Sequence, residues 1–124
     1  MEQNDLTNDG WKRYEPASVS SLCDRAYMNA TRKGFHEYTP VFGKAGQDAR
    51  HILSWLCLVT TEASEAAEEV RKGRDRNAFT SELADICIRT FDMAAALGLN
   101  LEQAILDKME KNESRPNMHG GKLA

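Results

Sequence analysis

Residues 47–72 carry an uninterrupted helical pattern, and this pattern limits the possible fold more than any other feature of the chain. Apolar side chains recur there at steps of three and four, at Ile52, Leu56, Val59, Ala63, Ala66 and Val70. This spacing places them on one face of an α-helix. Gly73 follows directly, and glycine readily adopts the left-handed conformation that ends a helix. We therefore predict a long amphipathic helix over 47–72.

Three more helices are predicted from capping residues and periodicity. One begins at about Ser18, whose hydroxyl can cap it, and ends near Gly34. Another, over 80–97, is apolar on almost every face, so it should be central and should also pack on another subunit. The last follows Asn100, which forms a variant of the capping box with Gln103, and runs through LEQAILDKMEKN.

These segments define the predicted fold class. No part of the sequence shows the alternation of a β-strand, and 124 residues are typical of one domain. We predict an all-α bundle of about four helices, with the two long helices packed antiparallel across a short connection. Residues 1–17 are polar and form an N-terminal arm, and 18–124 form the domain. The glycine-rich segment 34–46 is a connecting loop long enough to have a function.

Composition excludes several classes of protein. The chain has 16 Lys+Arg and 19 Asp+Glu, a net charge of −3, whereas proteins that bind nucleic acids or membrane surfaces usually have a basic excess. Residues 1–16 lack the basic region followed by an apolar run that is typical of a signal sequence, and no stretch approaches the roughly 18 apolar residues of a membrane span. Cys23, Cys57 and Cys87 are far apart without a CxxC spacing, so we expect buried, reduced thiols in a cytoplasmic protein.

Two acidic pairs mark a candidate site. Glu62 and Glu65 lie in the 47–72 helix, and Glu82 and Asp85 lie in the next one. Each pair has the spacing i, i+3, which puts both carboxylates on one face of a helix. Both pairs lie near the connection, so antiparallel packing would bring all four together. Clustered carboxylates are hard oxygen ligands that suit Mg²⁺ or Mn²⁺, and such ions polarise phosphate oxygens.

Other interpretations of these residues remain open at this point. Acidic residues at i, i+3 most often form a solvated helix face, although the second pair lies on a helix with few other charges. The chain could then be a non-enzymatic helical oligomerisation module. A ferritin-like di-iron site is excluded because it requires ExxH pairs, which the sequence lacks. Trp55, Phe35 and Tyr38 could stack on a base, but aromatic residues at helical positions usually belong to the core.

The C-terminal stretch supplies the opposite charge. Its basic and amide side chains fall within fifteen residues: Lys108, Lys111, Asn112, Arg115, His119 and Lys122. Lys108 and Asn112 share a helix face at i, i+4, and such groups bind phosphate oxygens through charged hydrogen bonds. The GGK segment could fold over a bound substrate.

The order ExxE, then ExxD on the next helix, then KMEKNESRPNMHGGK resembles the MazG-like branch of the all-α nucleoside triphosphate pyrophosphohydrolases, over roughly residues 24–122. The resemblance implies hydrolysis of a nucleoside triphosphate between the α- and β-phosphates, releasing pyrophosphate. It also implies a homodimer or a homotetramer. Small phage-encoded members that the chain resembles include enzymes acting on dATP or dGTP, so the resemblance suggests a dedicated enzyme that shapes a dNTP pool. The alternative is a house-cleaning hydrolase of modified nucleotides.

The resemblance also assigns roles to individual residues. Four carboxylates match the Mg²⁺ ligands of the family: Glu62, Glu65, Glu82 and Asp85. Glu65 is our choice for the group that orients or deprotonates the attacking water. Four C-terminal residues match the phosphate-binding positions: Lys108, Asn112, Arg115 and Lys122. Arg89 and Asp92 lie on the same line of the 80–97 helix as the ExxD pair, and the motifs give them no role.

Overall fold

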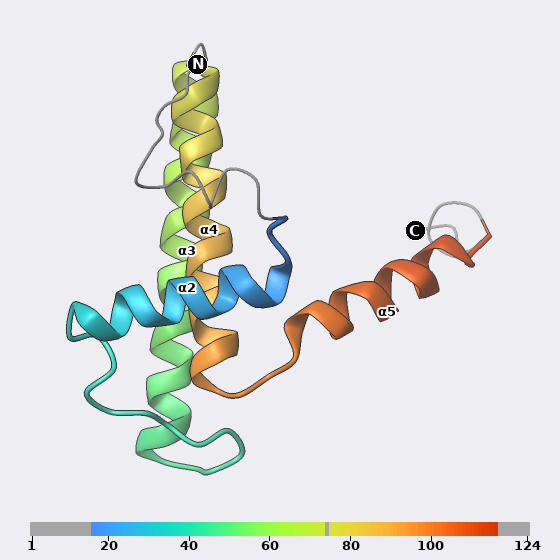
Figure 1. Ribbon diagram of the computed structural model, residues 1–124. Helices are drawn as coiled ribbons and strands as arrows, with labels where there is room; N and C mark the ends of the chain where they lie inside the picture. The colour runs from blue at the N-terminus through green and yellow to red at the C-terminus, as the bar shows by residue number, and fades with distance from the viewer. Residues whose placement is uncertain (1–15, 74, 117–124) are drawn as a thin grey trace.

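The computed structural model describes residues 16–73 and 75–116, and all regular secondary structure in these ranges is helical (Figure 1). The helices are α2 (Val19–Arg32), α3 (Gln47–Lys72), α4 (Arg76–Ala96) and α5 (Leu101–Glu113). The prediction of an all-α fold is therefore confirmed. Most of the predicted N-terminal arm lies outside the described residues.

Three of the helices begin or end at residues that the sequence indicates. Ser18 caps α2 in a reciprocal capping box with Ser21, with both hydrogen bonds at 3.0 Å. Gly73 ends α3 in the left-handed conformation, at φ 88°, and donates its N–H to the carbonyl of Glu69. Asn100 caps α5 by accepting a hydrogen bond from the N–H of Gln103 at 3.1 Å.

The start of α4 differs from the prediction. The helix begins at Arg76, four residues before the expected start at Thr80. Asp75 is the cause, because its side chain accepts a hydrogen bond from the N–H of Ala78 at 3.0 Å and so caps the helix one turn earlier. The connection between α3 and α4 is correspondingly short.

The long helices α3 and α4 lie side by side and run in opposite directions (Figure 1). α2 crosses this pair, and α4 contacts both α2 and α3. α4 is thus the central helix, as its apolar composition predicts. α5 extends away from the pair (Figure 1). Its first turn is attached to α2 by Glu102, which accepts a hydrogen bond from the N–H of Ser20 at 2.9 Å.

An aromatic cluster fixes the loop after α2 against the long helices. His36, in that loop, lies 2.6 Å from the carboxylate of Asp92 on α4, and its side chain is only 2% exposed. The ring of Tyr27 lies against it with centroids 4.9 Å apart, and Trp55 of α3 meets it edge-on at 5.5 Å. The loop is therefore held to all three helices around it.

The same loop is anchored to the start of α3 by a buried carboxylate. Asp48 is 4% exposed, and it accepts hydrogen bonds from the hydroxyl of Tyr38 and from the N–H of Val41. The hydrogen bond from Tyr38, followed by that from Val41, lowers the pKa of Asp48. These two hydrogen bonds stabilise the ionised carboxylate, and the carboxylate in turn satisfies the Tyr38 hydroxyl and the Val41 N–H of the loop.

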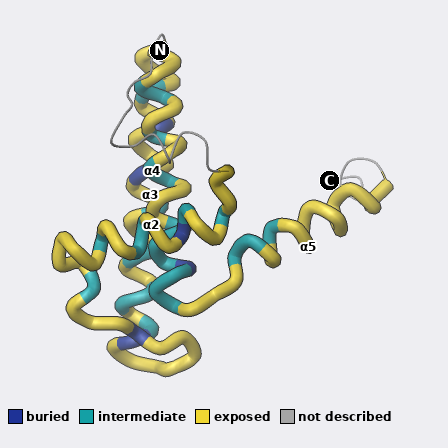
Figure 2. Tube along the Cα trace, viewed as in Figure 1, coloured by how far each residue is buried: buried dark blue, intermediate teal, exposed yellow. Residues whose placement is uncertain are grey.

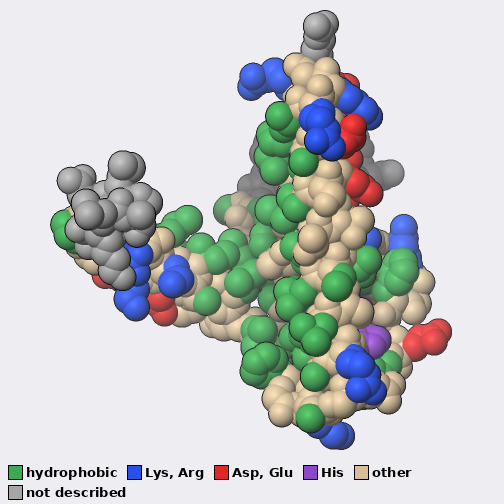
Figure 3. All heavy atoms as spheres, turned by 180° about the vertical axis from the view of Figure 1, so that it is seen from behind, with side chains coloured by type: hydrophobic (Ala, Val, Ile, Leu, Met, Phe, Trp, Pro, Cys, Tyr) green, Lys and Arg blue, Asp and Glu red, His purple; other side chains and the backbone are tan. Residues whose placement is uncertain are grey.

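The interior is small for a chain of this length (Figure 2). In residues 16–73 and 75–116 the buried core side chains are Cys23, Ala66 and Ala94, and no large side chain is fully buried. Hydrophobic side chains instead spread over the surface and along α5 (Figure 3). Cys57 and Cys87 are exposed, so the expectation of buried thiols is correct only for Cys23. None of the described helices combines the length and the hydropathy needed to cross a membrane.

Candidate functional site

Three of the four predicted acidic ligands meet between α3 and α4. One carboxylate oxygen from each of Glu62, Glu82 and Asp85 lies within 4.8 Å of the others. Glu62 is buried, and the other two are half-buried. The antiparallel arrangement produces this contact because the acidic turn of each helix lies in the half nearest the connection. These three residues are called the acidic group below.

Glu65 and Glu69 lie beside the acidic group without belonging to it. Glu65 is one turn beyond Glu62 on α3, and its side chain is exposed. Its negative charge still acts on the group, because it contributes to the raised pKa of Glu82. Glu69, one turn further along α3, forms an ion pair with Lys72 at 3.7 Å.

Glu82 has the electrostatic environment of a cation ligand. Burial raises its pKa, and the neighbouring carboxylates raise it further, with Glu65 first and Asp85 second. Its Oε1 atom is buried and accepts no hydrogen bond from any described residue. A buried, ionised oxygen without a partner is costly unless a cation or a proton compensates it. The acidic group therefore fits a hard divalent cation such as Mg²⁺.

Arg89 also contacts the acidic group, although the sequence motifs give it no role. Its Nε donates a hydrogen bond to Oε2 of Glu62 across the helix pair, at 3.1 Å. Arg89 lies one turn beyond Asp85 on α4, which places both on the same face. Its position on the polar line of α4 was visible in the sequence, but its partner on α3 was not.

The predicted phosphate-binding residues lie elsewhere in the chain. Lys108 and Asn112 are exposed on α5, and Arg115 is exposed just after it. Because α5 extends away from the α3–α4 pair, one copy of the chain does not bring these three residues to its own acidic group (Figure 1). Lys122 and His119 lie outside the described residues.

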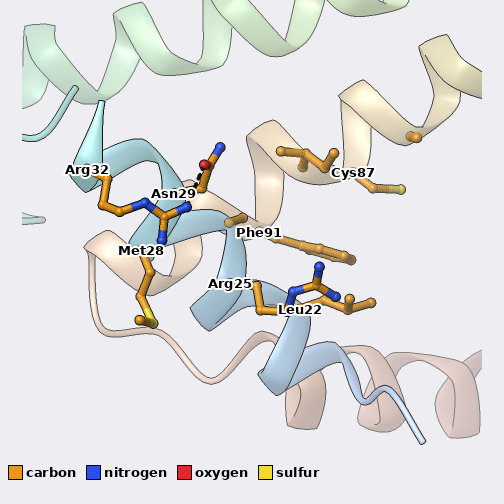
Figure 4. Close-up of a pocket in the computed structure, with 10 residues that line it drawn as sticks. Leu22, Arg25, Met28, Asn29, Arg32, Cys87 and Phe91 are labelled. Atoms are coloured by element: carbon orange, nitrogen blue, oxygen red, sulfur yellow. Dashed lines mark hydrogen bonds between the residues drawn. The ribbon is translucent and has the colours of Figure 1, made fainter. Parts of the chain in front are cut away.

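A separate pocket of about 750 Å³ lies between α2 and α4 (Figure 4). Its walls are mainly apolar, with Leu22, Met28 and Phe91 among them, and Arg25 and Arg32 are also part of its lining. None of the three residues of the acidic group lines it. The pocket therefore belongs to a different face of α4.

Comparison with known proteins agrees with this geometry. A model of the MazG nucleotide pyrophosphohydrolase domain matches residues 50–119, which are 70 of the 124 residues of the chain. The matched span contains the whole acidic group together with Arg89. No curated protein and no solved structure matches the chain. The resemblance noted in the sequence is thus confirmed, and the chain belongs to the family of the MazG nucleotide pyrophosphohydrolase domain.

Proposed function

We propose that this protein is a Mg²⁺-dependent nucleoside triphosphate pyrophosphohydrolase that cleaves the bond between the α- and β-phosphates and prefers purine deoxynucleotides. The family supports nucleotide pyrophosphohydrolase activity in general. The observation that carries the Mg²⁺ dependence is the acidic group, in which three carboxylates from two helices meet and Oε1 of Glu82 is buried without a hydrogen bond from any described residue.

The chemistry follows from the positions of the side chains. Glu62, Glu82 and Asp85 would hold Mg²⁺, which when bound neutralises phosphate charge and acts as a Lewis acid. Glu65 is exposed beside them, where its carboxylate would orient a water molecule and accept its proton. The water oxygen attacks phosphorus, and the bridging oxygen leaves with pyrophosphate. A nucleoside monophosphate remains.

The aromatic cluster supports a nucleoside substrate. Trp55 precedes Glu62 on α3 by seven residues, which is close to two full turns, so both side chains lie on one face about 10.5 Å apart along the helix. This separation is comparable to that between the phosphates and the base of a nucleotide. Trp55 lies beside His51, with centroids 5.1 Å apart, and is only partly buried. Stacking on such rings favours purines because their π-surface is larger.

The proposal also includes a homodimer or a homotetramer, with the phosphate-binding residues of α5 acting on a neighbouring subunit. Two observations support it. The apolar surface of the single chain is extensive, with Leu53 59% and Ile88 51% exposed. Lys108 and Arg115 also lie on or after a helix that extends away from the acidic group of its own chain.

The oligomer can be tested with an exposed apolar residue. We expect Ile88→Glu to shift the chain from an oligomer to a monomer in size-exclusion chromatography with light scattering, because a buried, unpaired carboxylate destabilises an apolar interface. Thr31→Glu, which adds the same charge at an exposed polar position of α2, should leave the mass unchanged. A wild-type monomer at micromolar concentration would contradict this part of the proposal.

The activity is tested with a panel of canonical and modified ribo- and deoxyribonucleoside triphosphates, each with Mg²⁺ and with EDTA. We expect pyrophosphate release that requires Mg²⁺ and is fastest with dATP or dGTP. Faster hydrolysis of modified nucleotides would favour the house-cleaning alternative. Release of inorganic phosphate would place cleavage at another bond, and the absence of any hydrolysis would favour an oligomerisation module.

A further inference from the structure

Arg89 engages the acidic group with only part of its side chain. Nε donates to Oε2 of Glu62, and no described residue accepts a hydrogen bond from its two terminal nitrogens. The side chain is 43% exposed, whereas that of Glu62 is 12% exposed. Arg89 therefore reaches from solvent into the site, and its two terminal nitrogens have no partner among the described residues. A guanidinium binds phosphate oxygens with two parallel hydrogen bonds, which a lysine cannot form.

The charges of the acidic group favour a positively charged side chain at position 89. Three ionised carboxylates and one guanidinium leave two net negative charges, which one divalent cation would balance. Glu65 and Glu69 add negative charge beside the group, as their effect on the pKa of Glu82 indicates. A triphosphate approaching these carboxylates is repelled unless positive charge meets it. In the described part of the chain, Arg89 is the only cation that forms an ion pair with the acidic group.

We propose that Arg89 is a phosphate-binding residue of this site. In the metal-free protein it neutralises Glu62. With a divalent cation held by Glu62, the Arg89 guanidinium would leave that carboxylate, and its terminal nitrogens would bind the phosphates of the nucleotide. This assignment rests on the proposed function, and it differs from the motif-based one in placing a phosphate ligand on α4 of the same chain, next to the metal ligands.

If Arg89 moves from Glu62 to the nucleotide phosphates, its removal should change two affinities in opposite directions, that for the metal ion and that for the nucleotide. Removing the guanidinium removes a competitor for Glu62, so Arg89→Met should bind Mn²⁺ about fivefold more tightly in the absence of nucleotide. The same variant should bind a non-hydrolysable α,β-imido deoxynucleotide about tenfold more weakly in the presence of Mg²⁺, with a similar rise in KM. A residue with a merely structural role would weaken both interactions or neither.

The experiment uses calorimetry for Mn²⁺ and for the analogue, and steady-state kinetics for KM, on the full chain. Methionine keeps an unbranched side chain but removes the charge. Arg89→Lys keeps the charge, so this variant should bind Mn²⁺ like the wild type and should keep part of the affinity for the analogue. Arg71→Met is the matched control, because Arg71 pairs with Glu68 on the solvent-exposed face of α3 at 2.9 Å. This control should behave like the wild type.

The outcomes separate this inference from the proposed function. If wild-type protein releases pyrophosphate but Arg89→Met has unchanged affinities for Mn²⁺ and the analogue, the assignment of Arg89 is wrong and the enzyme assignment stands. Parallel loss of both affinities in Arg89→Met and Arg89→Lys would also overturn it. If wild-type protein hydrolyses no nucleotide, the proposed function itself fails.

Discussion

Glu82→Gln is expected to reduce Mg²⁺-dependent pyrophosphate release by at least about 100-fold, and Asp85→Asn should have a similar effect. Each substitution preserves the size of the side chain and removes a negative charge from the acidic group. Glu82 should be the more sensitive of the two, because its buried Oε1 has no described partner within the protein and so depends most on a bound cation. Steady-state assays at saturating Mg²⁺ measure the loss.

The matched control is Glu68→Gln on the exposed face of α3, where the carboxylate pairs with Arg71 instead of entering the acidic group. It should retain wild-type activity. A stability measurement at pH 8 excludes misfolding as the cause of lost activity. Metal-free Glu82→Gln should be at least as stable as the metal-free wild type, because the substitution removes a carboxylate that its acidic neighbours repel. Wild-type activity in both Glu82→Gln and Asp85→Asn would remove the acidic group from the mechanism.

Mg²⁺ is expected to raise the melting temperature of the wild type, and more at pH 8 than at pH 5. The pKa of Glu82 is raised from its ordinary value of 4.5, first by burial and then by neighbouring carboxylates. Glu82 therefore stays protonated to a higher pH in the folded protein than in the unfolded chain. The stability of the metal-free protein consequently falls as the pH rises from 4.5 through the raised pKa of folded Glu82.

Mg²⁺ should offset this loss of stability at pH 8, because it should bind the deprotonated carboxylates of the folded chain. A ligand specific for the folded state contributes about 2.7 kcal/mol at 100 times its Kd. Thermal melts at both pH values, with Mg²⁺ or with EDTA, measure the difference. Glu82→Gln is the control and should lose most of the gain at pH 8. An equal gain in that variant would show that Mg²⁺ acts elsewhere on the chain.

Much of the fold could be predicted because helices are local structures. The spacing of apolar residues and Gly73 placed α3 at the bounds that the structure shows. Ser18 and Asn100 likewise cap α2 and α5 as expected. α4 begins about one turn before the predicted start because Asp75, a good capping residue, caps the helix ahead of Thr80.

The amino-acid sequence by itself determined which residues share a helix face, and so it determined that the acidic pairs and Arg89 lie along polar lines of α3 and α4. Only the tertiary structure decided that Glu62 rather than Glu65 joins Glu82 and Asp85, and that Arg89 pairs with Glu62. It also decided that α5 extends away from the acidic group. The reason is physical: helical periodicity sets the direction of a side chain from its own axis. The distance between residues of different helices depends on how whole faces pack, and therefore on how each helix is rotated and where it crosses its neighbour.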